Sequence, residues 1–350
     1  MTKHKLLTTL LIIIAFVFLA LSSLTYQFFR VPLVKKNEPT SVKVYPGQDV
    51  NVLVAHLYDR KIILYPNFFT WLVTITSNRF QFRYGEYQIK YPMTAWKLLK
   101  HMKAGTGLVK HRLTIVEGWT FSDIRAALLK DADLNQTLIN QPNQMVLQKL
   151  NAPEQHIEGL FYPNTYFFTW GNTDLSVLKT AYRKMQKILQ TDWASRAPNL
   201  PYQNAYQALI VASLIEKETA VPAEKPLIAS VIVNRLAKNM RLQIDPTVQY
   251  GANQNFNNPI TKKELATKTP YNTYLSDGLP PTPICVPSES SIQAALHPAT
   301  TDYLYYVATG KGGHHFSATY AQHLQQVQEY RNKISSEPRA SASGNNEANN

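Results

Sequence analysis

The stretch LLTTLLIIIAFVFLALSSLTYQFF, residues 6–29, carries no charged residue and contains neither Gly nor Pro. At about 1.5 Å per residue, a helix of this length reaches about 36 Å, enough to cross a bilayer. Secretory signal sequences have shorter apolar regions, typically about 7 to 15 residues, although Ala20, Ser22 and Ser23 leave room for cleavage. We therefore predict an uncleaved transmembrane helix at 6–29, with residues 1–5 before it. No later stretch is long and apolar enough to span, so the rest of the chain should lie on one side of the membrane.

Charge sets the orientation of this helix only weakly, since Lys3 and Lys5 precede it while Arg30, Lys35 and Lys36 follow it. The whole chain has 36 Lys plus Arg against 23 Asp plus Glu, a formal charge of +13, which favours an anionic partner. On the cytoplasmic side that partner would be nucleic acid or anionic lipid, and on the outer side it would be cell-wall polymer.

Composition narrows the class of protein further. With 45% hydrophobic and 17% charged residues, the 350-residue chain is not a mostly disordered protein and is long enough for two or three domains. Cys285 is its single cysteine, so neither an intramolecular disulfide nor a Cys-rich metal site can form.

Residues 40–150 repeat a pattern of short strand, glycine turn and amphipathic helix. VYPG at 44–47 and IVEG at 115–118 are each followed by apolar residues 3, 6 and 10 positions after the glycine, and a third, partial copy covers 87–102. The expected helix N-caps are Asp49 and Thr120. These copies predict small α+β modules that need one another to close a core.

The remainder, residues 151–334, is predicted to be mainly helical and rich in loops. A strongly apolar helix is expected from Asn204 to Thr219, ended by Pro222, and a second one at 225–236. Prolines then become frequent, which favours ordered loops of the kind that often carry functional residues. Residues 335–350, without large apolar side chains, are predicted to be a disordered tail.

Two carboxylates close the apolar helix. At about 100° per residue, Glu216 and Glu218 point about 200° apart, so one of them must be a solvated partner. Glu218 continues the apolar stripe of Val211, Leu214 and Ile215. Burial and the negative end of the helix dipole should both disfavour its charged form, raise its pKa and make it a proton donor at neutral pH.

A glycoside hydrolase normally needs a second carboxylate near the acid. Asp245 is the nearby candidate, but its sequence Asp-Pro-Thr is also that of an ordinary turn, so a structural role is the more common one for it. Gln243, Asn272 and Tyr274 offer amide groups and a ring face suited to sugar, although each residue type is also common in packing and turns. His314 stands in a glycine-rich loop without the spacing of a metal or nucleotide site, so neither a metal nor another cofactor is expected.

At these residues the sequence resembles the endolytic murein transglycosylase, or YceG-like, family. The matching segments follow one another along roughly residues 6–330: Glu117–Gly118, Ile157–Tyr166, Ala212–Ala220, Val233–Leu236, Met240–Val248, Thr269–Tyr274, Gly278–Pro281, Ala294–Pro298 and Gly310–His314. The resemblance implies an α+β protein with a single N-terminal transmembrane helix, a LysM-like module within 40–150 and a lytic transglycosylase domain at 151–334. It also implies an extracytoplasmic catalytic part at the inner (plasma) membrane, peptidoglycan strands as substrate, a penicillin-binding glycan synthase as partner and no nucleic-acid role.

The resemblance places the family's catalytic glutamate on Glu218 and explains the missing second carboxylate. In the family's chemistry this acid protonates the oxygen between MurNAc and GlcNAc and then accepts the proton of the MurNAc C6 hydroxyl, which closes on C1 to leave a 1,6-anhydro end. Internal cuts of this kind in nascent strands limit strand elongation. Residues expected to bind or orient the saccharide are Gln243, Asp245, Asn272, Tyr274 and His314.

Two other functions stay open on the residues alone. A hydrolase would use the same substrate and a water activated by Asp245. A non-catalytic scaffold would bind the wall without cutting it.

Overall fold

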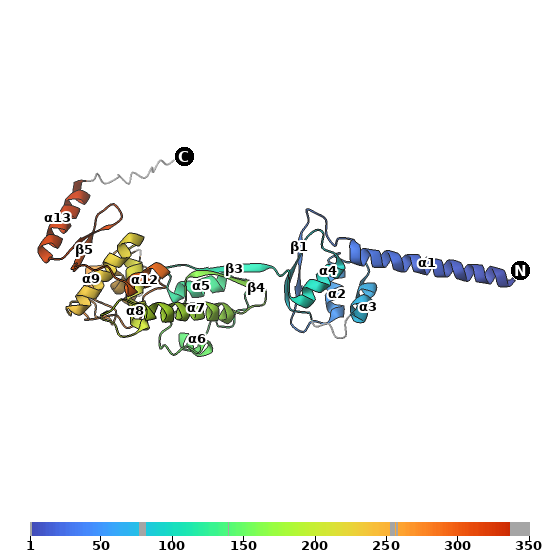
Figure 1. The fold of residues 1–350 in the computed structure, drawn as a ribbon, viewed down its shortest axis with the longest axis horizontal. Coiled ribbons are helices and arrows are strands. Elements are labelled where there is room, and N and C mark those ends of the chain that lie inside the picture. The colour runs from blue at the N-terminus through green and yellow to red at the C-terminus, as the bar shows by residue number, and fades with distance from the viewer. Residues whose placement is uncertain (1, 77–81, 139, 253–255, 257, 337–350) are drawn as a thin grey trace, which may run out of the picture. The chain divides into compact units, whose positions relative to one another are not determined.

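The computed structural model describes residues 2–76, 82–138, 140–252, 256 and 258–336 (Figure 1). Over these residues the chain is mixed α+β and mostly helical, as expected, and it divides into two compact units. The first unit contains residues 1–113, 131–136 and 167–174, and the second contains 114–130, 137–166 and 175–350.

This division cuts across the expected boundary at 150. The strand-turn-helix copy at 115–128 belongs to the second unit, because its turn is hydrogen-bonded to a distant loop of that unit. The N–H of Gly118 donates to Val286 O over 2.7 Å, and the N–H of Val286 donates to Trp119 O over 2.7 Å.

The long N-terminal helix α1 (Thr2–Arg30) confirms the helical prediction for residues 6–29. Within His4–Arg30, its most apolar 18-residue window has a mean hydropathy of 2.6 and is not covered by the rest of the protein. It is long and apolar enough to cross a membrane, and its length and composition suit either an anchor or a signal sequence.

In the first unit, three helices and a two-stranded antiparallel sheet share one hydrophobic core. In that sheet β1 (Thr40–Val44) pairs with β2 (Gly85–Ile89). The helices are α2 (Val50–Asp59), α3 (Pro66–Thr76) and α4 (Ala95–Ala104). Asp49 caps α2 by accepting the N–H of Asn51, as predicted, and Gly47 takes the left-handed conformation that its turn requires.

The second unit is built around α8 (Ala205–Glu218), which confirms the helix expected at 204–219. All residues from Ala208 to Ile215 are buried, as in a helix covered on every side. The helices packed on it include α9 (Lys225–Ala237), α10 (Asp245–Gly251) and α12 (Glu289–Leu296). Because α8 cannot move without disturbing these neighbours, the residue at its end has a fixed position.

The remaining helices belong to the second unit, and the remaining strands form two further two-stranded sheets. The other helices are α5 (Phe121–Lys130), α6 (Asn143–Leu150), α7 (Asp174–Ala194), the short 3-10 helix η1 (Pro222–Glu224), α11 (Lys262–Ala266) and α13 (Tyr320–Ser336). β3 (Lys110–Ile115) pairs with β4 (Asn164–Thr169), and β5 (Tyr305–Ala308) pairs antiparallel with β6 (His314–Ser317). Of the predicted tail, 335 and 336 belong to α13, and 337–350 lie outside the described residues.

Candidate active site

Glu218 is the last residue of α8, where the helix presents its unsatisfied carbonyl groups. Its side chain is partly buried, and burial raises the pKa of its carboxyl to about 7. A hydrogen bond from the Tyr306 hydroxyl acts in the opposite direction, while the negative charge of Asp245 raises the pKa further. A substantial fraction of the side chain is therefore protonated at neutral pH, as a general acid requires.

Tyr306 contributes the hydrogen bond from β5, an element far along the chain from Glu218. Burial and the charge of Glu218 raise the pKa of this phenol well above its ordinary value, so it remains a hydroxyl donor. The ring of His314 on β6 meets the Tyr306 ring edge-on at a centroid distance of 5.4 Å. Sequence analysis missed Tyr306 because no local pattern links it to the end of α8.

Asp245 and Tyr274 form a hydrogen-bonded pair close enough to Glu218 to affect its electrostatics. The Tyr274 hydroxyl donates to Asp245 Oδ1 over 2.5 Å. Burial, this hydrogen bond and the charge of Asp245 raise the pKa of Tyr274, which therefore stays neutral at physiological pH. Asp245 is exposed at the first turn of α10, so the structure brings two of the predicted saccharide-binding residues together.

Gln243 lies next to this pair on an exposed turn with a positive φ of 53°. Its side-chain oxygen accepts a hydrogen bond from Arg235 Nη1 over 3.2 Å. The buried Arg235 also donates to Leu242 O over 2.8 Å and, through Nε, to Leu304 O over 2.7 Å. Arg235, which sequence analysis did not select, thus ties the turn that carries Gln243 to the residue that precedes β5.

Asn272 has a different place from the one expected. Its side chain is fully buried, and its Nδ2 donates to Leu265 O over 3.0 Å and to Thr267 O over 2.8 Å. Its Oδ1 accepts the N–H of Tyr274 over 3.0 Å. The amide is occupied in shaping the loop that positions Tyr274, so we do not assign it to direct saccharide contact.

His314 is held by Glu224, a residue that sequence analysis did not single out. His314 Nδ1 lies 2.8 Å from Glu224 Oε2, and the N–H of His314 donates to Oε1 over 2.8 Å. The hydroxyl of Thr219, directly after Glu218, donates to the same carboxylate over 3.0 Å. Burial works to raise the pKa of Glu224, but these hydrogen bonds and the charge of His314 hold it below its ordinary value. Glu224 therefore stays ionised and links the end of α8 to β6.

Glu216 corrects the expectation that one carboxylate of the pair is solvated. Its side chain is only 11% exposed and lies 3.1 Å from the Nζ of Lys225. Burial works to raise its pKa, but hydrogen bonds from Ser288 and Ser291 and the charge of Lys225 lower it overall. The two glutamates do point to different surroundings, but both are enclosed by elements that follow α8 in the sequence.

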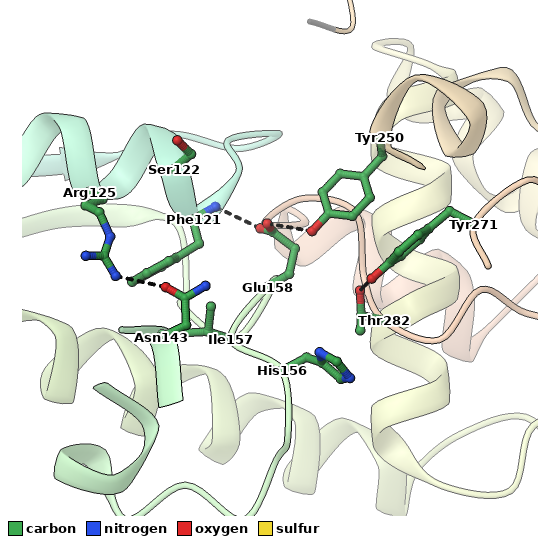
Figure 2. A pocket seen from close by; sticks show the side chains of 10 residues that line it. All are labelled: Phe121, Ser122, Arg125, Asn143, His156, Ile157, Glu158, Tyr250, Tyr271 and Thr282. Carbon is green, nitrogen blue, oxygen red and sulfur yellow. Dashed lines mark hydrogen bonds between the residues drawn. The ribbon is translucent and has the colours of Figure 1, made fainter. Parts of the chain in front are cut away.

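A second buried carboxylate with a raised pKa lies elsewhere in the second unit (Figure 2). Glu158 lines a cavity of about 300 Å³ to which Glu218 does not contribute. Glu158 accepts the N–H of Phe121 over 2.8 Å and the hydroxyl of Tyr250 over 3.0 Å. Burial raises its pKa to about 7 despite these hydrogen bonds. Glu158 therefore has the same raised pKa as Glu218 but lies in a different cavity with different neighbours.

Glu158 should make the stability of the protein depend on pH. Its carboxyl titrates near 4.5 in an unfolded chain and near 7 when folded, so the folded state loses stability as the pH rises through this window. The expected contribution is about 3 kcal/mol between pH 4.5 and 7. Glu158→Gln removes this titration, and urea unfolding at pH 5 and pH 8 should show a smaller difference than in the wild type. An equal difference in both proteins would contradict the assignment.

One further group of acidic and histidine side chains lies in the first unit. His111 Nδ1 is 3.0 Å from Asp133 Oδ2, and His111 Nε2 is 3.5 Å from Glu86 Oε2. The spacing would suit a metal ion, but the Nζ of Lys43 is 3.8 Å from Asp133 and supplies a competing positive charge. We assign no metal to this group, whose close contacts link β2, β3 and the 131–136 segment.

The fold and the site together define a mixed α+β protein with a long N-terminal apolar helix and, at the end of a central helix, a glutamic acid whose pKa is raised to about 7. Residues 42–329 match the model of the YceG-like family, and the chain belongs to this family. The resemblance noted in the sequence is thereby confirmed.

Individual relatives agree with this placement. The chain is 30% identical over 316 residues to the endolytic murein transglycosylase of Bacillus subtilis, covering 85% of this chain and 87% of that protein. It is 29% identical over 256 residues to the protein of the same name from Streptococcus pneumoniae, covering 64% of this chain and 46% of that protein. A crystal structure of a YceG-like protein from Listeria monocytogenes has a TM-score of 0.52 and 28% identity, covering 82% of this chain and 98% of that one.

Proposed function

We propose that this protein is a membrane-anchored lytic transglycosylase that cuts the MurNAc–GlcNAc bond inside nascent peptidoglycan strands. The observation that carries the proposal is Glu218, a carboxyl with a pKa of about 7 that accepts a hydrogen bond from Tyr306 and is affected by the charge of Asp245. The names of the relatives supply the substrate class, and α1 supplies the anchor. On this proposal the LysM-like part lies in the first unit and helps to hold the glycan.

The reaction needs one acid that acts twice. The protonated Glu218 gives its proton to the glycosidic oxygen as the bond from that oxygen to C1 of MurNAc breaks. The resulting carboxylate accepts the proton of the C6 hydroxyl, whose oxygen forms the new bond to C1 and yields the 1,6-anhydro end. Since the nucleophile belongs to the substrate, its proximity is intramolecular and no water-activating base is required.

The neighbours of Glu218 have complementary tasks in this scheme. Tyr306 stabilises the carboxylate formed after proton transfer, and the charge of Asp245 favours the protonated form before it. Asp245 and its hydrogen-bonded partner Tyr274, together with Gln243 and His314, would orient the sugar or stabilise positive charge at C1. Repeated cuts within strands would limit their length, and a penicillin-binding glycan synthase is the expected partner.

Mass spectrometry of the released fragments tests the reaction. Full-length protein in detergent, given un-crosslinked glycan strands, should release fragments that end in anhydro-MurNAc. Because the charge of Asp245 acts on Glu218, the alternative function is a hydrolase in which Asp245 activates water. Hydrolysis would give fragments heavier by one water, and intact strands after incubation would support a non-catalytic binding protein.

The pH dependence of cleavage should move in opposite directions in two variants. Activity requires protonated Glu218, so it should fall as the pH rises through the pKa of about 7. Tyr306→Phe removes a hydrogen bond that lowers this pKa, and the loss of activity should therefore shift to higher pH. Asp245→Asn removes a charge that raises it, and the loss should shift to lower pH. Cleavage rates measured from pH 5 to pH 9 check both shifts, and parallel shifts or none would contradict the assigned roles.

A further inference from the structure

The end of α1 is part of the first unit's core. Phe28 is only 5% exposed, and its ring packs against Phe69 of α3 at a centroid distance of 5.4 Å. Phe29 contacts Trp96 of α4 at 5.4 Å, and the N–H of Leu33 donates to Met93 O over 2.7 Å. No free linker therefore separates the apolar helix from the folded unit.

This packing fixes the depth of α3 relative to a bilayer that α1 crosses. A hydrocarbon core of about 30 Å takes about 20 helical residues, which reach from Leu6 to about Thr25. The next turn of α1 then lies among the lipid headgroups. Leu24, Phe28 and Val31 line one side of a groove of about 210 Å³, and residues 62–65 and 68–69 line the other. The start of α3 consequently lies at the level of the membrane surface.

Helix α3 is apolar on two opposite sides. Its inner side buries Phe69, Leu72 and Val73, whereas on its outer side Trp71 is 53% and Ile75 57% exposed. The residues just before α3 add Leu64, 69% exposed, and Tyr65, 47% exposed. The helix sequence PNFFTWLVTIT contains no charged residue. Water is an unfavourable neighbour for such a surface, while Trp, Tyr and aliphatic side chains are typical of the membrane interface.

We propose that Leu64, Tyr65, Trp71 and Ile75, the interfacial patch, insert into the headgroup region of the same bilayer that α1 crosses. The inference rests on the proposed membrane anchor, whose continuity with the patch identifies lipid as the occupant. Lys61 lines the same groove and Arg30 ends α1, so both place positive charge where lipid phosphates lie. The first unit then touches the membrane at two places, which limits its tilt relative to the bilayer.

Site-specific fluorescence in vesicles tests this placement. The full-length protein is reconstituted into vesicles of phosphatidylcholine and phosphatidylglycerol, with the environment-sensitive probe NBD on Leu64→Cys or Ile75→Cys. The native Cys285 is fully buried, and burial raises the pKa of its thiol, so it should not react. The matched control is Phe167→Cys, which replaces a 69% exposed apolar residue of the first unit outside the patch.

The probes at 64 and 75 should show blue-shifted emission and several-fold stronger quenching by nitroxide-labelled lipid than the probe at 167. Equal quenching at all three positions would overturn the inference. Blue-shifted emission without lipid quenching would also overturn it, in favour of a protein partner or a second copy of the chain. Thermal unfolding of each labelled protein confirms that the exposed substitutions leave the fold intact.

Two further readouts separate this inference from the proposed function. Flotation of the protein with vesicles that have been washed in high salt reports on the anchor, and digestion of glycan strands by the same preparation reports on the enzyme. A protein that floats and cuts glycan but shows no quenching at the patch refutes the inference alone. A protein that does not float refutes the anchor and the inference together, whatever its activity.

Discussion

Glu218→Gln should lower the rate of glycan cleavage by on the order of 10² to 10⁴-fold, the range typical of losing a general acid. The amide has nearly the shape of the acid and can still accept the hydrogen bond from Tyr306, so the fold should be retained. It cannot, however, deliver a proton to the glycosidic oxygen. The release of anhydro-ended fragments, followed by mass spectrometry, measures the loss.

Glu158→Gln is the matched control for this experiment. Both glutamates lie in the second unit, and burial raises the pKa of each to about 7. Glu158 lines a different cavity, where its oxygens accept from Phe121 and Tyr250. Its variant should retain activity within a few-fold of the wild type. An active Glu218→Gln protein, or a Glu158→Gln protein that folds but does not cut, would move the catalytic acid away from Glu218.

Lys225→Met should destabilise the protein by about 3–5 kcal/mol, because it leaves the buried carboxylate of Glu216 without its counter-charge. The side chain of Lys225 is 6% exposed, and its ammonium group also donates to Ser288 Oγ over 2.8 Å and to Ser290 Oγ over 3.0 Å. This network ties α9 and α12 to the last turn of α8. Part of the activity should therefore be lost as well, since Glu218 follows Glu216 by two residues.

Urea unfolding of a double-mutant cycle measures this interaction. Glu216→Gln combined with Lys225→Met removes both charges, and the amide can still accept hydrogen bonds from Ser288 and Ser291. The double variant should be more stable than Lys225→Met alone, because the uncompensated charge is gone. If the loss of unfolding free energy in the double variant equals the sum of the losses in the two single variants, Glu216 and Lys225 are not energetically coupled.

Much of the local structure follows from neighbouring residues alone. An uncharged apolar run predicted α1, and a carboxylate that continues the apolar stripe of α8 predicted Glu218 as a candidate acid. Asp49 preceding an amphipathic segment predicted the start of α2. Such features depend on hydrogen bonds and side chains within about one helical turn, so a linear pattern reports them directly.

The surroundings of the acid could not be obtained in this way. Tyr306, Arg235 and Glu224 act on the site from elements that no periodicity connects to the end of α8. From their residue types, Glu216 was predicted to face solvent and Asn272 to bind sugar. In the structure both side chains are buried, and their polar atoms are hydrogen-bonded within the protein.

The sequence by itself determined the apolar helix, the central helix and which carboxylate ends its apolar stripe. Tertiary structure alone decided which groups surround each carboxylate. The pKa of such a group depends on its burial and on charges and donors within a few ångströms, and these come from segments that only folding brings together.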